Sequence, residues 1–109
     1  MDITTRQQLI DRYKDGYRVV AEALVGATDA ELDAKPAPGK WSAREVVHHL
    51  ADSEMTAAIR LRRLLAEDRP QIVGYDQDEY ARRLHYDRPI GGSLEALEAA
   101  RVSTGEMLD

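Results

Sequence analysis

Several features common in proteins are missing from this sequence, and each absence excludes a class of structure or chemistry. Cysteine is absent, so disulfides, thiolate metal sites and a cysteine nucleophile are excluded. No apolar run approaches the roughly 20 residues that a membrane-spanning helix needs. No basic cluster offsets the net charge of −5, which argues against binding to nucleic acid or to an anionic membrane. The first residues show no signal-peptide pattern, so we expect a cytoplasmic protein.

The residues that are present suit a single helical domain. The chain has 109 residues, of which 43% are hydrophobic, enough to form the core of one domain spanning residues 1–109. Phenylalanine is also absent, so aliphatic side chains, Trp41 and tyrosines must fill that core. The sequence shows neither the apolar–polar alternation of β-strands nor an internal repeat. We therefore predict an all-α, up-and-down helical bundle.

Two long helices are predicted towards the ends of the chain. The first starts at Thr4 or Thr5 as its cap and continues to about Leu24, where Gly26 provides a natural stop. The last starts with Ser93 as its cap and continues to the final residues, which carry no signal of a helix end. We therefore expect this last helix to be cut off before its natural end and the domain to be C-terminally incomplete.

The longest helix is predicted between these two. Ser42 can accept a hydrogen bond from the backbone of Glu45, and the Glu45 side chain can return one to the Ser42 backbone, which forms a capping box. The helix should run to about Glu67, because Pro70 cannot continue it. Two short helical segments are also predicted, at residues 28–32 and at residues 77–84 with Asp76 as cap.

Six polar side chains gather on one side of the longest helix. At helical spacing they form one stripe, called here the polar strip: Glu45, His49, Asp52, Ser53, Thr56 and Arg60. His48 points about 100° away from His49, so we expect His48 to face solvent. Glu54 falls within the apolar face and needs a partner, because an unpaired buried charge is very costly. That partner is either Arg60 or a residue of another helix.

The polar strip allows three interpretations. His49 could bind a divalent metal, with a carboxylate as a further ligand or as a group that orients the imidazole. It could instead act as a general acid or base without metal, because an imidazole can take up and release a proton near neutral pH. Spacing alone favours the third interpretation, a hydrogen-bonded polar flank, because a metal site normally takes ligands from two or more elements. We interpret His85 as a surface hydrogen-bonding residue and Trp41 as a packing anchor.

The residues around this helix entrance resemble a known family. The run Lys40–Glu54, KWSAREVVHHLADSE, with Arg60 after it, is similar to the helix-entry motif of the DinB-like superfamily, also called YfiT-like metalloenzymes. The stretch 75–87, YDQDEYARRLHYD, is similar to one branch of that family. The resemblance implies a four-helix bundle, often dimeric, in which three histidines bind nickel, zinc or a similar divalent ion. The first family histidine, eight residues past Trp41, falls on His49.

The same resemblance implies a function. The other two family histidines come from a His-x-x-x-His motif on a fourth helix, which these 109 residues do not contain. The family implies a metal-dependent enzyme acting on a small molecule, either a hydrolase or a thiol S-transferase with a low-molecular-weight thiol as co-substrate. His49 would be the metal ligand, and Asp52, Glu45 and Arg60 would orient that ligand or the substrate. The alternative is a non-catalytic helical module that forms dimers without metal. We expect a homodimer.

Overall fold

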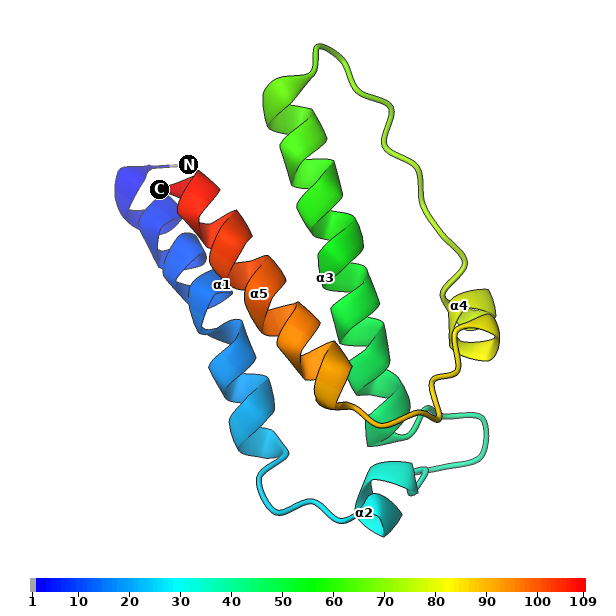
Figure 1. Cartoon of the computed structure of the whole chain (residues 1–109). Helices are drawn as coiled ribbons and strands as arrows, with labels where there is room; N and C mark the ends of the chain where they lie inside the picture. Colours follow the sequence, from blue (N-terminus) through cyan, green and yellow to red (C-terminus); the bar gives the residue numbers. More distant parts are fainter. Residues whose placement is uncertain (1) are drawn as a thin grey trace.

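The structure is built from helices joined by loops (Figure 1). It is a computed structural model that describes residues 2–109. Three helices are long and two are short: α1 (Ile3–Ala23), α2 (Asp29–Asp33), α3 (Ala43–Ala66), α4 (Gln77–Arg83) and α5 (Gly91–Leu108). No strand occurs in this part of the chain, which confirms the predicted all-α class. None of these helices is both long enough and apolar enough to cross a membrane.

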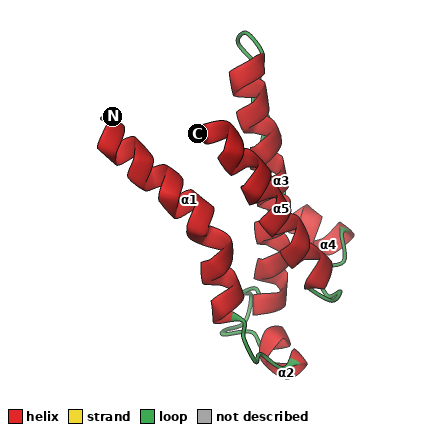
Figure 2. Ribbon diagram, turned by 60° about the vertical axis from the view of Figure 1, so that its left-hand side comes forward, coloured by secondary structure: helices red, strands yellow, loops and turns green. Residues whose placement is uncertain are grey.

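Helix α5 holds the other two long helices together. It packs against both α3 and α1, whereas the backbones of α1 and α3 do not pack directly against each other. Figure 2 shows α1 set apart from α3. The radius of gyration is 15.6 Å, against about 13 Å expected for a compact domain of ~100 residues. The three long helices therefore form an open bundle with one side uncovered.

The ends of α3 follow the local signals in the sequence. The Ser42 side chain accepts a hydrogen bond from the Glu45 N–H, and the Glu45 carboxylate accepts one from the Ser42 N–H at 3.1 Å. After the helix, Arg69 has a left-handed φ of 51° directly before Pro70. Gly26, which follows α1, has a φ of 74°, a conformation that glycine adopts without steric cost. These capping and termination predictions are confirmed.

Two helix starts differ from the prediction. Helix α1 is capped by Asp2, whose side chain accepts a hydrogen bond from the Thr5 N–H at 2.6 Å, so the predicted threonine cap is wrong. Helix α5 begins at Gly91, and Ser93, its predicted cap, lies inside the helix with its side chain buried. The reason is a tertiary contact, because Ser93 Oγ lies 2.6 Å from a ring nitrogen of His48 on α3.

Glu54 on α3 is a buried carboxylate that joins all three long helices. It accepts hydrogen bonds from the Tyr13 hydroxyl of α1 and from Arg101 Nε of α5. The Arg101 guanidinium lies 4.5 Å from the centroid of the Tyr13 ring and donates to the Tyr13 carbonyl at 2.6 Å. Gly16 allows this approach, because a Cβ at that position would overlap the guanidinium. The charged partner of Glu54 is therefore Arg101 and not Arg60.

Candidate functional site

The polar strip lies on a half-buried side of α3. The most buried side of this helix carries Val47, Ala51 and Ala58, and the strip residues fall on the other side of the helix. All six strip residues are half-buried. Part of this cover comes from the connection between α3 and α4, residues 67–76, which runs alongside α3 (Figure 1).

His49 lies near the entrance of α3. Its ring packs edge-on against Trp41, with 5.1 Å between the ring centroids and 63° between the ring planes, so Trp41 has the anchoring role predicted for it. His49 Nδ1 is buried and has no hydrogen-bond partner among the described residues. Such an atom is uncommon, because leaving a buried polar group unsatisfied costs free energy. Trp41 therefore holds the His49 ring in place, and Nδ1 of that ring makes no hydrogen bond within residues 2–109.

Asp52, about one turn after His49, is already hydrogen bonded. The Tyr86 hydroxyl donates to Asp52 Oδ2 at 2.6 Å, and the backbone carbonyl of Asp52 accepts from Thr56 Oγ1 at 2.8 Å. Tyr86 is 2% exposed. Burial, followed by the hydrogen bond to Asp52, raises the pKa of Tyr86 above its usual value. The phenol therefore stays protonated at neutral pH and holds the Asp52 carboxylate in one orientation.

The two ends of the polar strip have different surroundings. Glu45 belongs to the capping box of α3 and lies 3.8 Å from Lys35 Nζ, so its carboxylate serves the start of the helix. Arg60 Nη2 donates to the Val73 carbonyl at 2.8 Å, which ties the 67–76 connection to α3. Arg60 Nε is buried without a partner. Arg60 is about 16 Å from His49 along the helix axis, so these two residues do not share one small site.

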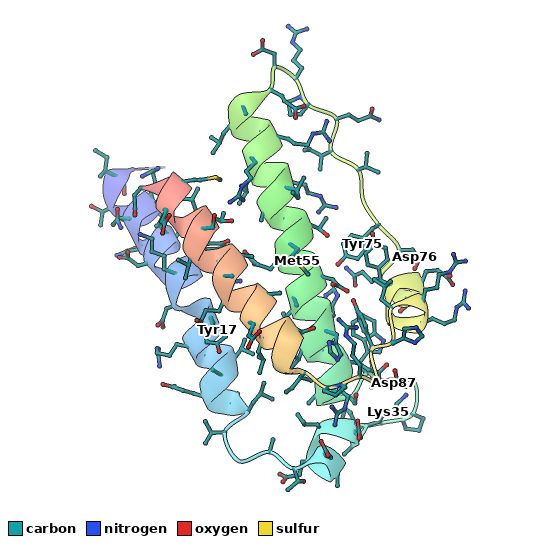
Figure 3. All side chains as sticks on the ribbon, in the orientation of Figure 1. Tyr17, Lys35, Met55, Tyr75, Asp76 and Asp87 are labelled. Carbon is teal, nitrogen blue, oxygen red and sulfur yellow. The ribbon has the colours of Figure 1, made fainter. Side chains whose placement is uncertain are left out.

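Tyr75 adds another unpartnered polar atom on this side of the molecule. It lies in the 67–76 connection, next to α3 (Figure 3). Its hydroxyl is buried without a hydrogen-bond partner, and its ring packs against Tyr80 with 4.4 Å between centroids. The sequence pattern did not identify Tyr75 as a site residue, because an irregular connection has no periodicity that fixes where a side chain points.

His48 is buried, and the prediction that it faces solvent is wrong. Its exposure is 0%. Nε2 lies 2.8 Å from the Arg88 carbonyl oxygen, and Nδ1 lies 2.6 Å from Ser93 Oγ. Because a carbonyl oxygen only accepts, Nε2 carries the proton, and Nδ1 of the neutral ring accepts from the Ser93 hydroxyl. Helix α5 and the loop before it cover this face of α3. Both ring nitrogens are used, so His48 is not available to a metal.

Within residues 2–109, no group of three or more His, Cys, Asp or Glu side chains is arranged to hold a metal ion. His48 is fully engaged, and His85 lies in the turn that follows α4. His49 is the histidine that has a buried, unpartnered ring nitrogen. The described residues therefore do not provide a complete set of metal ligands.

An apolar groove of about 530 Å³ lies between α1 and α3. Its walls include Val19 and Ala23 of α1, Val46 and Leu50 of α3, and Trp41. Val19 is 55% exposed and Val46 is 39% exposed. Since Trp41 also packs against His49, the groove and the candidate ligand are next to each other.

The arrangement of these helices is that of a four-helix-bundle protein. YfiT from Bacillus subtilis, described as "a probable metal-dependent hydrolase with an unusual four-helix bundle topology", matches this structure with a TM-score of 0.92 and 28% sequence identity. The match covers 99% of this chain and 62% of the YfiT chain. The family model of the DinB superfamily matches residues 12–109. The chain belongs to the DinB superfamily.

Sequence relatives agree with this membership. A protein of Oceanobacillus iheyensis is 38% identical over 90 residues, which are 83% of this chain and 52% of the relative. A protein of Bacillus pumilus is 40% identical over 78 residues, which are 72% of this chain and 43% of the relative. Both carry the name "Putative metal-dependent hydrolase". The chain thus spans about half the length of the curated relatives it matches.

Proposed function

We propose that this protein supplies one ligand, His49, to the divalent metal centre of a hydrolase that acts on a small molecule. The observation that carries the proposal is the buried, unpartnered Nδ1 of His49. Imidazole nitrogen is a good ligand for zinc and nickel, the two metals that the family resemblance implies. The names of the relatives, which describe metal-dependent hydrolases, support the same class of reaction.

Among the described residues, His49 is suited to be one ligand of such a metal. The remaining ligands would come from a helix packed into the groove between α1 and α3, either from the same protein or from a second copy of this chain. A helix in that groove would lie against Val46 and Leu50, beside the strip that carries His49. A homodimer is part of this proposal, since an exposed apolar groove favours association.

The bound metal would supply a Lewis acid that lowers the pKa of water. The protein's own residues would position the reacting groups. Trp41 fixes the plane of the His49 ring. Asp52, held by the Tyr86 hydroxyl, presents an oriented acceptor about one turn away. The Tyr75 hydroxyl, buried without a partner, would donate a hydrogen bond to the substrate.

Metal content is the first test of this proposal. The purified protein should contain about one divalent ion per chain by elemental analysis, and His49→Ala should lose it. His85→Ala is the matched control, because it removes a histidine from a loop instead of from α3, and it should keep the metal. Metal retained in stoichiometric amount by His49→Ala would count against the proposal.

Two alternatives differ in their products or in their metal content. A thiol S-transferase with a low-molecular-weight thiol as co-substrate would give a thiol adduct and not the products of hydrolysis, and mass spectrometry of reaction mixtures distinguishes these. A non-catalytic module would be a metal-free dimer. Light scattering combined with elemental analysis identifies that case, and such a result would refute the enzyme assignment.

A further inference from the structure

A second pocket lies between α3 and the 67–76 connection. Its volume is about 370 Å³, and its lining residues are Met55, Thr56, Ile59, Arg60, Arg63 and Val73. Figure 3 marks Met55 on α3, on the part of the helix that the connection passes. His49 does not line this pocket. The pocket is therefore a site separate from the candidate metal ligand.

The lining of this pocket combines cationic and apolar side chains. It contains two arginines, one hydroxyl and three apolar residues, and no carboxylate. The chain as a whole carries a net charge of −5, so a pocket with only cationic charges differs from the average surface. Arginine binds carboxylates through paired, planar hydrogen bonds. The apolar residues can pack against a hydrocarbon body.

The two arginines differ in how many of their guanidinium nitrogens donate hydrogen bonds. Arg63 donates to the Gln71 carbonyl at 2.9 Å and to the Glu67 carboxylate at 3.3 to 3.4 Å. Arg60 donates from Nη2 to the Val73 carbonyl, but its Nε is buried and has no partner within residues 2–109. A buried N–H on a cationic group needs an acceptor. Arg60 is therefore the residue of this pocket whose unpaired N–H an anionic ligand could satisfy.

We propose that this pocket binds the carboxylate end of a small-molecule substrate with an apolar body, and that Arg60 anchors the carboxylate. The proposal rests on the proposed function, because it assigns the far end of the same substrate. Thr56 is seven residues from His49, about 10 Å along the helix axis. Arg60 is eleven residues from His49, about 16 Å along the helix axis. The substrate would thus span between about 10 and about 16 Å from its carboxylate to the reacting group.

Binding of hexanoate to the metal-free protein, in the presence of a chelator, tests this inference. Hexanamide has the same shape without the charge and serves as the matched probe. Hexanoate should shift the Arg60 Nε–H resonance saturably, and hexanamide should bind at least about tenfold more weakly. Arg60→Gln should weaken hexanoate binding by at least about tenfold. Arg82→Gln, which changes an exposed arginine of α4, should bind as the wild type does.

Arg60→Lys is a second variant, for the case that Arg60→Gln does not fold. Lysine keeps the positive charge of Arg60 but lacks the planar guanidinium. If Arg60→Gln melts early, Arg60→Lys carries the test and should also bind hexanoate more weakly than the wild type. Equal binding of hexanoate and hexanamide, or wild-type binding by a folded Arg60 variant, would overturn the inference. Because metal is removed, loss of carboxylate binding is distinguishable from failure of the metal assignment.

Discussion

Ser93 Oγ of α5 lies 2.6 Å from Nδ1 of His48 on α3. On the other side of the ring, Nε2 donates to the Arg88 carbonyl at 2.8 Å. One buried imidazole therefore joins α3, α5 and the loop between α4 and α5. This contact also sets the rotation of α3. With His48 against α5, the next residue, His49, is turned about 100° away, onto the polar strip.

We predict that Ser93→Ala lowers the free energy of unfolding by about 1–3 kcal/mol, because His48 Nδ1 would remain buried without a donor. Urea denaturation measures the loss. Glu106→Ala, which changes an exposed residue of the same helix, is the control and should change stability by no more than about 0.5 kcal/mol. Equal effects of the two substitutions would show that the His48 contact does not stabilise the fold.

The stability of the protein should fall in mild acid because of His48. Burial lowers the pKa of His48 from its usual 6.5, as do the nearby cations Arg88 and Arg44, while the hydrogen bond to the Arg88 carbonyl and the charge of Asp52 raise it. The unfolded chain therefore binds the proton more readily than the folded one. The contribution of His48 is fully present above about pH 6.5 and is lost as the pH falls below that value.

Urea midpoints measured between pH 7.5 and pH 5 test this pH dependence. The wild type should lose stability across that range, and His48→Gln should lose less. His85→Gln should keep the wild-type slope, because His85 lies outside the core. If the urea midpoint of His48→Gln falls with pH as steeply as that of the wild type, the acid sensitivity comes from carboxylates and not from His48.

Gly16→Ala should destabilise the protein, although alanine is favoured over glycine by about 1 kcal/mol in a helix interior. The new Cβ would overlap the Arg101 guanidinium, which must then leave the Tyr13 carbonyl and Glu54. We expect a net loss of about 1–3 kcal/mol, measured by chemical denaturation. Gly92→Ala in α5, where a Cβ meets nothing within 4 Å, should be neutral or stabilising. Stabilisation by both substitutions would contradict the close approach of Arg101.

Glu54 and Arg101 should behave as one unit. Glu54→Leu leaves Arg101 without its carboxylate, and Arg101→Leu leaves Glu54, whose side chain is 8% exposed, without its cation. Each single change should cost about 3 kcal/mol. The double change Glu54→Leu/Arg101→Leu should cost less than the sum, because it leaves no unpaired charge. A double-mutant cycle measures this coupling, and strict additivity would refute it.

Local signals in the sequence predicted the helices well. The capping box of Ser42 and Glu45 and the break at Pro70 depend on residues within a few positions of each other, so the bounds of α3 could be read directly. The environment of His48 could not be predicted in this way. It depends on Ser93, 45 residues away in the chain, and a single-helix pattern does not say which neighbour covers which face.

The candidate site was predictable only where it lies on α3. The helical period placed His49 and Asp52 on one side of α3, and the structure puts them there. The partner of Glu54 stayed open because Arg101 is 47 residues away. Tyr86 reaches Asp52 of the polar strip from an irregular segment. The path of the other irregular segment, which carries Tyr75, depends on contacts such as that between Arg60 and the Val73 carbonyl.

The most direct test of the central claim, that His49 is a metal ligand, is a zinc titration of protein labelled with ¹⁵N in its imidazole rings. We predict that a ring nitrogen of His49 shifts and saturates at about one zinc ion per chain, while His48 and His85 keep their resonances. Zinc that leaves His49 unchanged, or that shifts His85 instead, would contradict the claim.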